Sequence, residues 1–331
     1  MRKMNFQELF DAISNLRVGI IGDVMLDTYM WGHVERISPE APVPIVALDQ
    51  RDYRMGGAGN VALNVRSLGA TTFVLTVTGD DDDARALQNL FATQNINTQY
   101  SFCSSERITT NKIRIISRNQ QMMRLDTEIT YDLSAIDEER LIKQVHQFIV
   151  TEQPDIIILQ DYNKGVLTEK VIASVIRQCR EANVLTAVDP KRKNFFSYKG
   201  VDLFKPNLKE VKEALNILAA DVDLHFLKHV HTELYHQLQQ NISLITLSEK
   251  GVFYQQNGEA AIIPSHLRTI ADVSGAGDTV IAVATLVYAA KRDVRLMAEI
   301  ANIAGGLVCE EVGTAAINGV KLLQECATLL S

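Results

Sequence analysis

The amino-acid sequence predicts an α/β protein with a mostly parallel central sheet, flanking helices and a second, smaller sheet. Three observations support this prediction. From residue 155 onward, short apolar runs alternate with segments of helical periodicity, which is typical of parallel strands joined by crossover helices. Polar residues directly follow several of the apolar runs, as they do at the carboxyl ends of parallel strands. A glycine-rich stretch at 271–279 leads into an apolar run at 280–290, as a turn leads into a buried helix.

The composition restricts the class of protein. The 331 residues carry a formal net charge of −7, with 47% hydrophobic and 22% charged residues. An acidic balance disfavours general nucleic-acid binding, which needs a broad basic surface. No apolar run approaches the roughly 18 residues that suggest a membrane span, and the four scattered cysteines show no disulfide or zinc spacing. We therefore expect a soluble, cytoplasmic protein that binds neither nucleic acid nor a membrane.

The first half is predicted to contain both sheets. An amphipathic helix is expected within 1–16, followed by a strand at 17–22 with Asp23 directly after it. The segment 37–44 holds three of the seven prolines, which excludes a helix there. Further strands are predicted at 43–48, 72–78, 100–103, 112–116 and 122–125, and helices at 61–68 and 80–91. Strands from about 34–55 and 99–126 are expected to form the smaller sheet.

The second half is predicted to alternate regularly. Strands are expected at 155–159, 184–188, 201–204 and 243–247, and helices at 137–150, 168–182, 207–219, 226–239, 275–290, 294–311 and 319–330. The polar residues that follow these strands include Asp161, Asp189 and Glu210. Because the carboxyl ends of parallel strands meet at one edge of a sheet, we expect these side chains to line a cleft.

The glycine-rich stretch Ala271-Asp-Val-Ser-Gly-Ala-Gly-Asp-Thr279 carries the strongest functional signal. Gly275 and Gly277 precede a helix whose unpaired N–H groups and dipole would attract an anion such as phosphate. Asp278 in the first turn has two possible roles. A carboxylate there is usually a helix cap. Its charge would oppose phosphate binding, however, unless it accepts a proton from an attacking hydroxyl, so we favour a general base.

Two groups of residues are candidates for holding a substrate. Asp23 and Asp27 lie near the carboxyl end of the first strand, although loop or cap carboxylates explain them equally well. The glycine cluster at 56–60, Met55-Gly-Gly-Ala-Gly-Asn60, precedes a helix. Such a cluster indicates either a tight turn or close approach of the backbone to a ligand.

Basic and amide residues gather at 112–121. Lys112, Arg114 and Arg118 would share one face of a strand that extends far enough, and Asn119 and Gln120 add amides. Positive charge on an exposed sheet edge can simply discourage aggregation. The functional alternative is a pocket for a substrate that already carries a phosphate.

Two clusters of metal-binding residue types have structural explanations. The acids at 80–83 would complement the dipole at the start of a helix. His225 and His229 have the i, i+4 spacing of a metal-binding helix face, but an ordinary, partly exposed helix explains them better. We therefore predict no metal at either place.

Asp23, the glycines at 56–60, Asn207-Leu-Lys-Glu210 and the motif 272–278 together resemble the ribokinase-like, or phosphofructokinase-B-type, carbohydrate kinases. The resemblance spans nearly the whole chain. Within that family the segments 22–27, 36–44, 112–121 and 161–165 are most similar to the heptose 7-phosphate kinases. The resemblance implies a single kinase domain over 1–331, with about nine strands in the central sheet and the smaller sheet as a lid over the sugar.

The resemblance also implies a role for each candidate residue. Asp278 would be the catalytic base, beside an anion hole formed by Gly275, Ala276 and Gly277. The sugar would be held by Asp23, Asp27, Gly56, Gly57, Asn60, Lys112, Arg114, Arg118, Asn119, Gln120 and Lys164. ATP would be bound by Asn207, Leu208, Lys209, Glu210, Ser248, Glu249, Lys250, Gly251, Asp272, Asn302 and Gly306. Glu210 would reach Mg²⁺ through water.

The reaction implied is ATP-dependent phosphorylation of D-glycero-D-manno-heptose 7-phosphate on its C1 hydroxyl, giving heptose 1,7-bisphosphate for lipopolysaccharide core precursors. Two alternatives stay open: a kinase for another sugar or sugar phosphate, such as fructose 6-phosphate or ribose, and a non-catalytic sugar-phosphate sensor. Mg²⁺ with ATP is the expected cofactor, a monovalent cation is a further candidate, and a homodimer through the lid sheets is the expected assembly.

The sequence departs from the pattern of its relatives in three respects. Ser274 stands where the family commonly has Thr, and Gln160 stands where heptose kinases often have Ser. We expect neither residue to touch the base. The His-x-Gly-His signature of the nucleotidyltransferase domain in the bifunctional ADP-heptose proteins is absent from the sequence, so phosphorylation alone is expected.

Overall fold

The fold is described from a computed structural model that defines residues 5–118, 120–218 and 221–330. Its main body is an eight-stranded sheet in the order β14-β13-β12-β11-β10-β9-β1-β4. The strands are β1 (Arg17–Gly22), β4 (Thr71–Leu75), β9 (Ile156–Gln160), β10 (Leu185–Asp189), β11 (Leu203–Phe204), β12 (Ile242–Thr246), β13 (Val252–Gln256) and β14 (Glu259–Ile263). In this sheet order, neighbouring strands from β12 to β4 are parallel, which confirms the predicted α/β class.

The antiparallel hairpin of β13 and β14 was not predicted. It extends the parallel sheet at one edge, and the total is eight strands rather than about nine. Parallel strands covered on both faces have continuous apolar runs, whereas both strands of this hairpin mix apolar and polar residues. The weaker pattern explains why the sequence did not reveal it.

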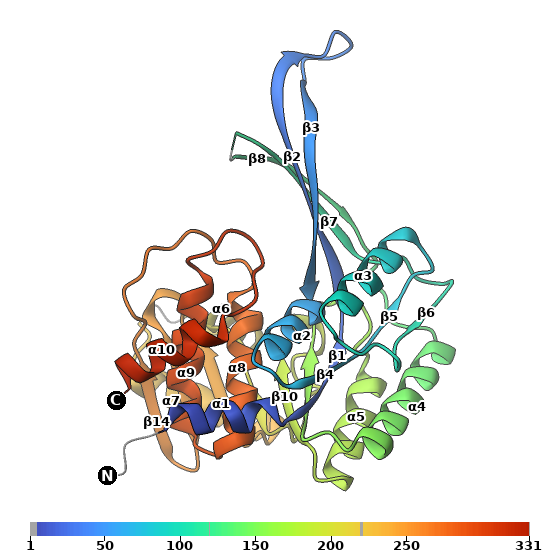
Figure 1. The fold of residues 1–331 in the computed structure, drawn as a ribbon. Helices are drawn as coiled ribbons and strands as arrows, with labels where there is room; N and C mark the ends of the chain where they lie inside the picture. Colours follow the sequence, from blue (N-terminus) through green and yellow to red (C-terminus); the bar gives the residue numbers. More distant parts are fainter. Residues whose placement is uncertain (1–4, 119, 219–220, 331) are drawn as a thin grey trace.

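Helices cover both faces of the sheet (Figure 1). They are α1 (Phe6–Ser14), α2 (Ala58–Ser67), α3 (Asp82–Thr93), α4 (Ala135–Glu152), α5 (Glu169–Glu181), α6 (Leu208–Ala214), α7 (Leu224–Leu238), α8 (Ala276–Lys291), α9 (Val294–Val308) and α10 (Gly319–Leu329). Short 3₁₀ turns occur at Arg192–Asn194 and Ser248–Lys250. Within the described part of the chain, no helix has the length and apolar composition needed to cross a membrane.

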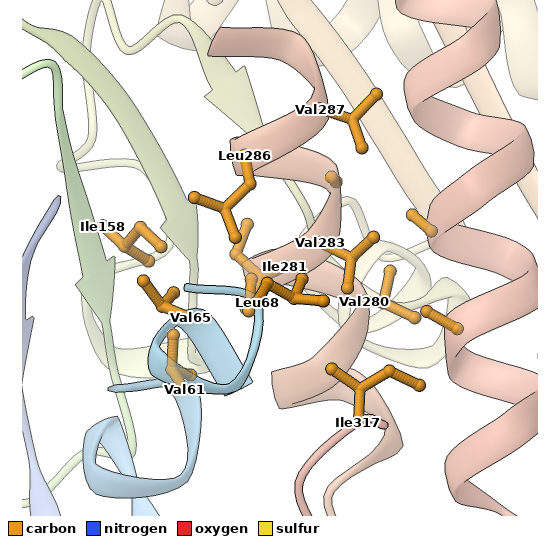
Figure 2. Close-up of a cluster of buried hydrophobic side chains, with 14 of the residues drawn as sticks. Val61, Val65, Leu68, Ile158, Val280, Ile281, Val283, Leu286, Val287 and Ile317 are labelled. Atoms are coloured by element: carbon orange, nitrogen blue, oxygen red, sulfur yellow. The ribbon is translucent and has the colours of Figure 1, made fainter. Parts of the chain in front are cut away.

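Two hydrophobic cores lie on opposite faces of the sheet. Successive strand residues alternate between them: Ile158 joins the core of α1, α2, α8, α9 and α10, whereas Ile157 joins the core of α4, α5 and α7. Helix α8 lies deep in the first core, with every residue from Asp278 to Val287 buried. Figure 2 shows part of this core, in which Val61, Val65, Leu68, Ile158, Val280, Ile281, Val283, Leu286, Val287 and Ile317 are labelled. The first turn of α8 is therefore held rigidly.

The smaller sheet projects from the main body (Figure 1). Its strand order is β3-β2-β7-β8, with β2 (Val24–Ile37), β3 (Pro44–Gly57), β7 (Asn111–Ser117) and β8 (Gln120–Thr127). The predicted boundary at about residue 34 is wrong, because β2 begins at Val24 and Asp27 lies inside it, opposite Arg54 and Lys112. The residues Val24–Tyr29 are buried, so they lack the alternation of a half-exposed strand.

The segment near residue 100 was also expected in the lid and is not there. Strand β6 (Phe102–Cys103) instead pairs with β5 (Val77–Thr78) in a separate two-stranded sheet. Phe102 is buried with Val77 in the core under α4. Burial beside the main sheet therefore decides its position.

Candidate active site

A glycine-rich turn brings Asp278 to the start of the buried helix α8. Gly275 is the residue before the helix and has a left-handed backbone, with φ 80°. A Cβ at this position would lie 2.7 Å from Nδ2 of Asn60. Both the conformation and the space therefore require glycine. The N–H of Ala276 donates to the carbonyl oxygen of Val273 at 3.3 Å, and the anion hole at Gly275, Ala276 and Gly277 stays a prediction.

The carboxylate of Asp278 accepts hydrogen bonds from three side chains. Nδ2 of Asn60 donates to Oδ2 at 2.8 Å, while Nε2 of Gln160 and the hydroxyl of Tyr162 donate to Oδ1 at 3.1 and 2.7 Å. The alternative that Asp278 caps the helix is not supported, because α8 has no side-chain cap. The expectation that Gln160 does not touch the base is wrong. These donors orient the carboxylate.

Burial sets the proton affinity of Asp278. The residue is 3% exposed, and desolvation raises the pKa of its carboxyl group from 3.8 to about 6, against the lowering effect of Asn60 and Tyr162. Such a group is mostly ionised at neutral pH, yet it binds a proton more readily than an exposed carboxylate. Both properties suit a general base.

Two lysines place positive charge beside the turn. Nζ of Lys205 lies 3.0 Å from Asp189, and Nζ of Lys191 lies 2.6 Å from Glu210 and 3.4 Å from Asp189. A Cβ on Gly277 would be 3.9 Å from both Lys205 Nζ and Asp189 Oδ2. The polar residues predicted from the strand ends therefore lie together with cations as well as acids. Lys205 follows β11 directly, and that position was the available signal for it.

Asp23 anchors a loop. Its carboxylate accepts the backbone N–H groups of Tyr162, Lys164 and Val166 at 2.8, 3.0 and 3.1 Å, and the residue is 1% exposed. Burial raises the pKa of the Asp23 carboxyl group, while these N–H groups and nearby Arg107 lower it. Asp23 thus holds the segment that carries Tyr162 against Asp278. A direct contact with the sugar remains a prediction.

Asp27 forms a buried ion pair at the base of the lid. Nη1 of Arg114, on the neighbouring strand β7, lies 2.6 Å from Oδ1 of Asp27, and the guanidinium stacks on the ring of Tyr29. A Cβ on Gly56 would lie only 2.3 Å from Oδ2 of Asp27. The glycine thus leaves the carboxylate room. The structure brings together Asp27, Gly56 and Arg114, and their contact with the sugar stays a prediction.

The other basic candidates are spread along the lid. Nζ of Lys112 lies 5.9 Å from the centre of the Tyr162 ring, and Lys164 is ion-paired with Glu128 at 2.8 Å. Strand β7 ends at Ser117, so Arg118 lies in the following turn with φ 48°, and the predicted shared face does not extend to it.

Gln120 begins β8 opposite Ser117 and is exposed. At about 3.3 Å per residue, the register places Gln120 roughly 16 Å from the level of Lys112. Asn119 lies outside the described residues. The structure therefore gathers Lys112 and Arg114 near the base and leaves Arg118 and Gln120 at the outer end of the lid.

The predicted nucleotide segment at 207–210 forms a capping box. Oδ1 of Asn207 accepts the N–H of Glu210 at 2.9 Å, and Oε2 of Glu210 accepts the N–H of Asn207 at 2.8 Å. Leu208 packs against the core of α4, α5 and α7, and the side chain of Lys209 is 85% exposed. Of this group, Glu210 faces the cluster of strand-end charges through Lys191.

The segments predicted for adenine adjoin the chain that precedes α8. Gly251 has φ 96°, and a Cβ there would lie 2.0 Å from the carbonyl oxygen of Ile263. Nδ2 of Asn302 donates to the carbonyl of Pro264 at 2.8 Å. A Cβ on Gly306 would lie 2.9 Å from the Arg268 side chain. The other members of this predicted set, Ser248, Glu249 and Lys250, form the 3₁₀ turn just before Gly251.

Asp272 stabilises the glycine turn. Its carboxylate accepts the N–H and the hydroxyl of Ser274 at 3.0 and 2.8 Å and the N–H of Gly313 at 2.9 Å. These bonds outweigh burial and lower the pKa of the Asp272 carboxyl group. The hydroxyl of Ser274 therefore binds Asp272 and not the base, because the hydrogen bonds to the Asp278 carboxylate come from Asn60, Gln160 and Tyr162.

These features define a sugar kinase. The chain matches the pfkB family of carbohydrate kinases over residues 16–319 and belongs to that family. Its fold is similar to that of phosphofructokinase-2 from Escherichia coli, crystallised with potassium, with a TM-score of 0.77 over 95% of this chain and 99% of the other, at 16% identity.

Two curated relatives are much closer in sequence. The bifunctional protein HldE of Methylobacillus flagellatus is 40% identical over 306 residues, which is 92% of this chain and 62% of the relative. The HldE protein of Syntrophotalea carbinolica is 35% identical over 99% of this chain and 66% of the relative. The chain thus spans just under two thirds of the length of these bifunctional proteins.

Proposed function

We propose that this chain transfers the γ-phosphoryl group of ATP to the C1 hydroxyl of D-glycero-D-manno-heptose 7-phosphate, giving heptose 1,7-bisphosphate. The observation that carries the proposal is the buried, oriented carboxylate of Asp278 at a glycine-rich helix start. Its partner Tyr162 has the ammonium of Lys112, on lid strand β7, 5.9 Å from the ring centre. The choice of sugar rests on the resemblance of 22–27, 36–44, 112–121 and 161–165 to heptose 7-phosphate kinases. The identity of 35–40% with HldE proteins supports the same choice.

In this mechanism the attacking hydroxyl gives its proton to Asp278. Its oxygen forms a bond to the γ-phosphorus as the bond between that phosphorus and the β–γ bridging oxygen breaks, which releases ADP. The N–H groups of Gly275 and Gly277 stabilise negative charge on the moving group. Lys205 and Lys191 add positive charge nearby. Positioning and electrostatics thus supply most of the rate enhancement, as in other phosphoryl transfers.

The described residues fit Mg²⁺ bound together with ATP. Each oxygen of the Glu210 carboxylate accepts one hydrogen bond, from Lys191 or from the N–H of Asn207, which leaves lone pairs free for a metal-bound water. Mg²⁺ prefers such oxygen ligands and retains several waters. When bound, it neutralises charge on the phosphates. A monovalent cation remains a further prediction for this chain.

A substrate panel tests the proposed function. Purified protein is given ATP, Mg²⁺ and one of heptose 7-phosphate, fructose 6-phosphate or ribose, and ADP release is measured. We expect heptose 7-phosphate to give the highest kcat/KM and mass spectrometry to identify a bisphosphate. Higher kcat/KM with fructose 6-phosphate or with ribose would overturn the choice of sugar. No turnover with any sugar would contradict the kinase mechanism.

The lid also supports a homodimer. Apolar side chains are exposed on three of its four strands, β2, β3 and β8, among them Ile37, Leu48, Tyr53, Met122, Met123 and Leu125, which are 38–60% exposed. An exposed apolar surface on a projecting sheet favours association with a matching surface. We propose that two copies associate through their lids. Light scattering should then give twice the mass of one chain, and a mass of 36.8 kDa at micromolar concentration would contradict the proposal.

A further inference from the structure

The phenol of Tyr162 lies where the mechanism requires the attacking hydroxyl. Its oxygen donates to Oδ1 of Asp278 at 2.7 Å. An alcohol that transfers its proton to Asp278 must first form a similar hydrogen bond. Burial and the nearby carboxylates raise the pKa of the phenol well above 10, so Tyr162 stays neutral and keeps its own proton. The tyrosine is thus an unreactive stand-in for the substrate.

The ring of Tyr162 also occupies the region predicted for the sugar. A Cβ on Gly57 would lie 3.5 Å from Cδ2 of this ring. The ammonium groups of Lys112, on lid strand β7, and Lys191, after strand β10, lie 5.9 and 5.5 Å from the ring centre. Tyr162 therefore contacts the glycine turn and lies between the lid and the strand ends. A sugar hydroxyl that binds Oδ1 of Asp278 in place of the phenol displaces the ring.

The three partners of Asp278 differ in their freedom to move. Asn60 and Gln160 are 0% exposed, whereas Tyr162 is partly exposed. The backbone of Tyr162 is fixed, because its N–H donates to Asp23 at 2.8 Å. Rotation of the side chain would break the bond to Asp278 without moving the loop. Asn60 and Gln160 would continue to orient the carboxylate.

We propose that Tyr162 is a positioning residue that keeps water from the base until a sugar displaces it. The inference rests on the kinase function proposed above and deepens it. Without this block, water could give a proton to Asp278, bond to the γ-phosphorus and release ADP and phosphate. Tyr162 would thus make the enzyme select an alcohol over water before any lid movement.

The test is the variant Tyr162→Phe, assayed for ATP hydrolysis in the absence of any sugar. Loss of one hydrogen bond to a charged acceptor should raise hydrolysis by about tenfold. Transfer to the sugar should change by a smaller factor than sugar-free hydrolysis, because the bound sugar displaces the ring in either protein. The matched control is Tyr198→Phe, since Tyr198 donates at the same 2.7 Å to the buried carboxylate of Asp161 instead. This control should leave sugar-free hydrolysis unchanged.

Three results would overturn the inference: unchanged sugar-free hydrolysis in Tyr162→Phe, an equal rise in Tyr198→Phe, or extra hydrolysis that persists in the double variant Tyr162→Phe with Asp278→Asn. The hydrolysis assay needs no sugar, so a failed choice of sugar would leave it interpretable. A crystal structure of the wild-type chain with a bound sugar phosphate tests the same point without a variant. The phenol should have left Asp278, and a phenol still within hydrogen-bond distance beside the bound sugar would refute its displacement.

Discussion

Replacing Asp278 with Asn should strongly lower turnover and stabilise the protein at the same time. The carboxyl group is 3% exposed and its pKa is raised from 3.8 to about 6. A difference of about two pKa units corresponds to roughly 3 kcal/mol by which the charge destabilises the folded chain at neutral pH. The penalty is complete above pH 6 and disappears as the pH falls towards 4, because the folded chain binds the proton first.

The amide of Asn resembles the protonated acid, so Asp278→Asn should recover much of this energy. Its N–H groups would face the donors Asn60, Gln160 and Tyr162, which costs about 1 kcal/mol and leaves a net gain of about 1 to 2 kcal/mol at pH 8. Thermal melts at pH 8 should show a Tm higher by about 1–2 °C per kcal/mol for a chain of this length. At pH 4 the gain should vanish.

Turnover of the same variant should fall by about 10²- to 10⁴-fold, the usual contribution of a general base. Affinity for ATP should be unchanged or higher, because a negative charge next to the phosphate site is removed. The matched control is Asp161→Asn, since Asp161 is also buried with a pKa of about 6 but binds Tyr198. The control should show the same dependence of stability on pH and a much smaller loss of turnover. Turnover of Asp278→Asn within tenfold of wild type, or a stability change independent of pH, would refute the assignment.

Three further predictions follow from the site. The plot of kcat/KM against pH should have an acid limb near pH 6 and fall about tenfold from pH 7 to pH 5, because Asp278 becomes protonated in the free enzyme. A kcat/KM that does not change with pH in this range would exclude Asp278 as the base. Gly275→Ala should lower kcat at least about tenfold, because the left-handed backbone is strained and the new Cβ clashes with Asn60, which holds the base. The control is Gly258→Ala, which is also left-handed but has nothing within 4 Å, so its kcat should be unchanged. Arg114→Ala leaves the charge of Asp27 buried and unpaired, so the KM for the sugar phosphate should rise about tenfold while the KM for ATP stays the same. An equal rise in both KM values would contradict a role for Arg114 in binding the sugar.

The elements of the fold were predictable wherever local patterns were strong. The apolar run at 280–290 is the buried helix α8, and the capping box at Asn207 marks the start of α6. Strand β2 was missed because its first residues are buried on both faces and carry no alternation. The edge hairpin of β13 and β14 was missed because its pattern is short and mixed. Tertiary burial, rather than local preference, decides these elements.

The candidate site was predictable at its glycines and its base, but its partners were not. Gly275 and Asp278 are neighbours in one motif, so their spacing carries the chemistry. Asn60, Gln160 and Tyr162 lie more than 100 positions from Asp278 along the chain, and only the fold brings them together. Gln160 carried no functional signal, since a side chain at the end of a strand has many possible neighbours. The sequence therefore indicates where the chemistry happens, and the structure indicates what controls it.

An acid beside a phosphate site opposes phosphate binding, yet the proposed mechanism turns this charge into a kinetic advantage. In the ground state, the carboxylate of Asp278 repels the γ-phosphoryl group, and Lys205 and Lys191 offset only part of this because they are paired with Asp189 and Glu210. As the hydroxyl gives up its proton, Asp278 becomes neutral and the repulsion disappears. The site thus favours the transition state more than bound ATP, and such differential stabilisation is what accelerates a reaction. Asp278→Asn, which is neutral throughout, should therefore bind ATP well and still fail to transfer the phosphoryl group.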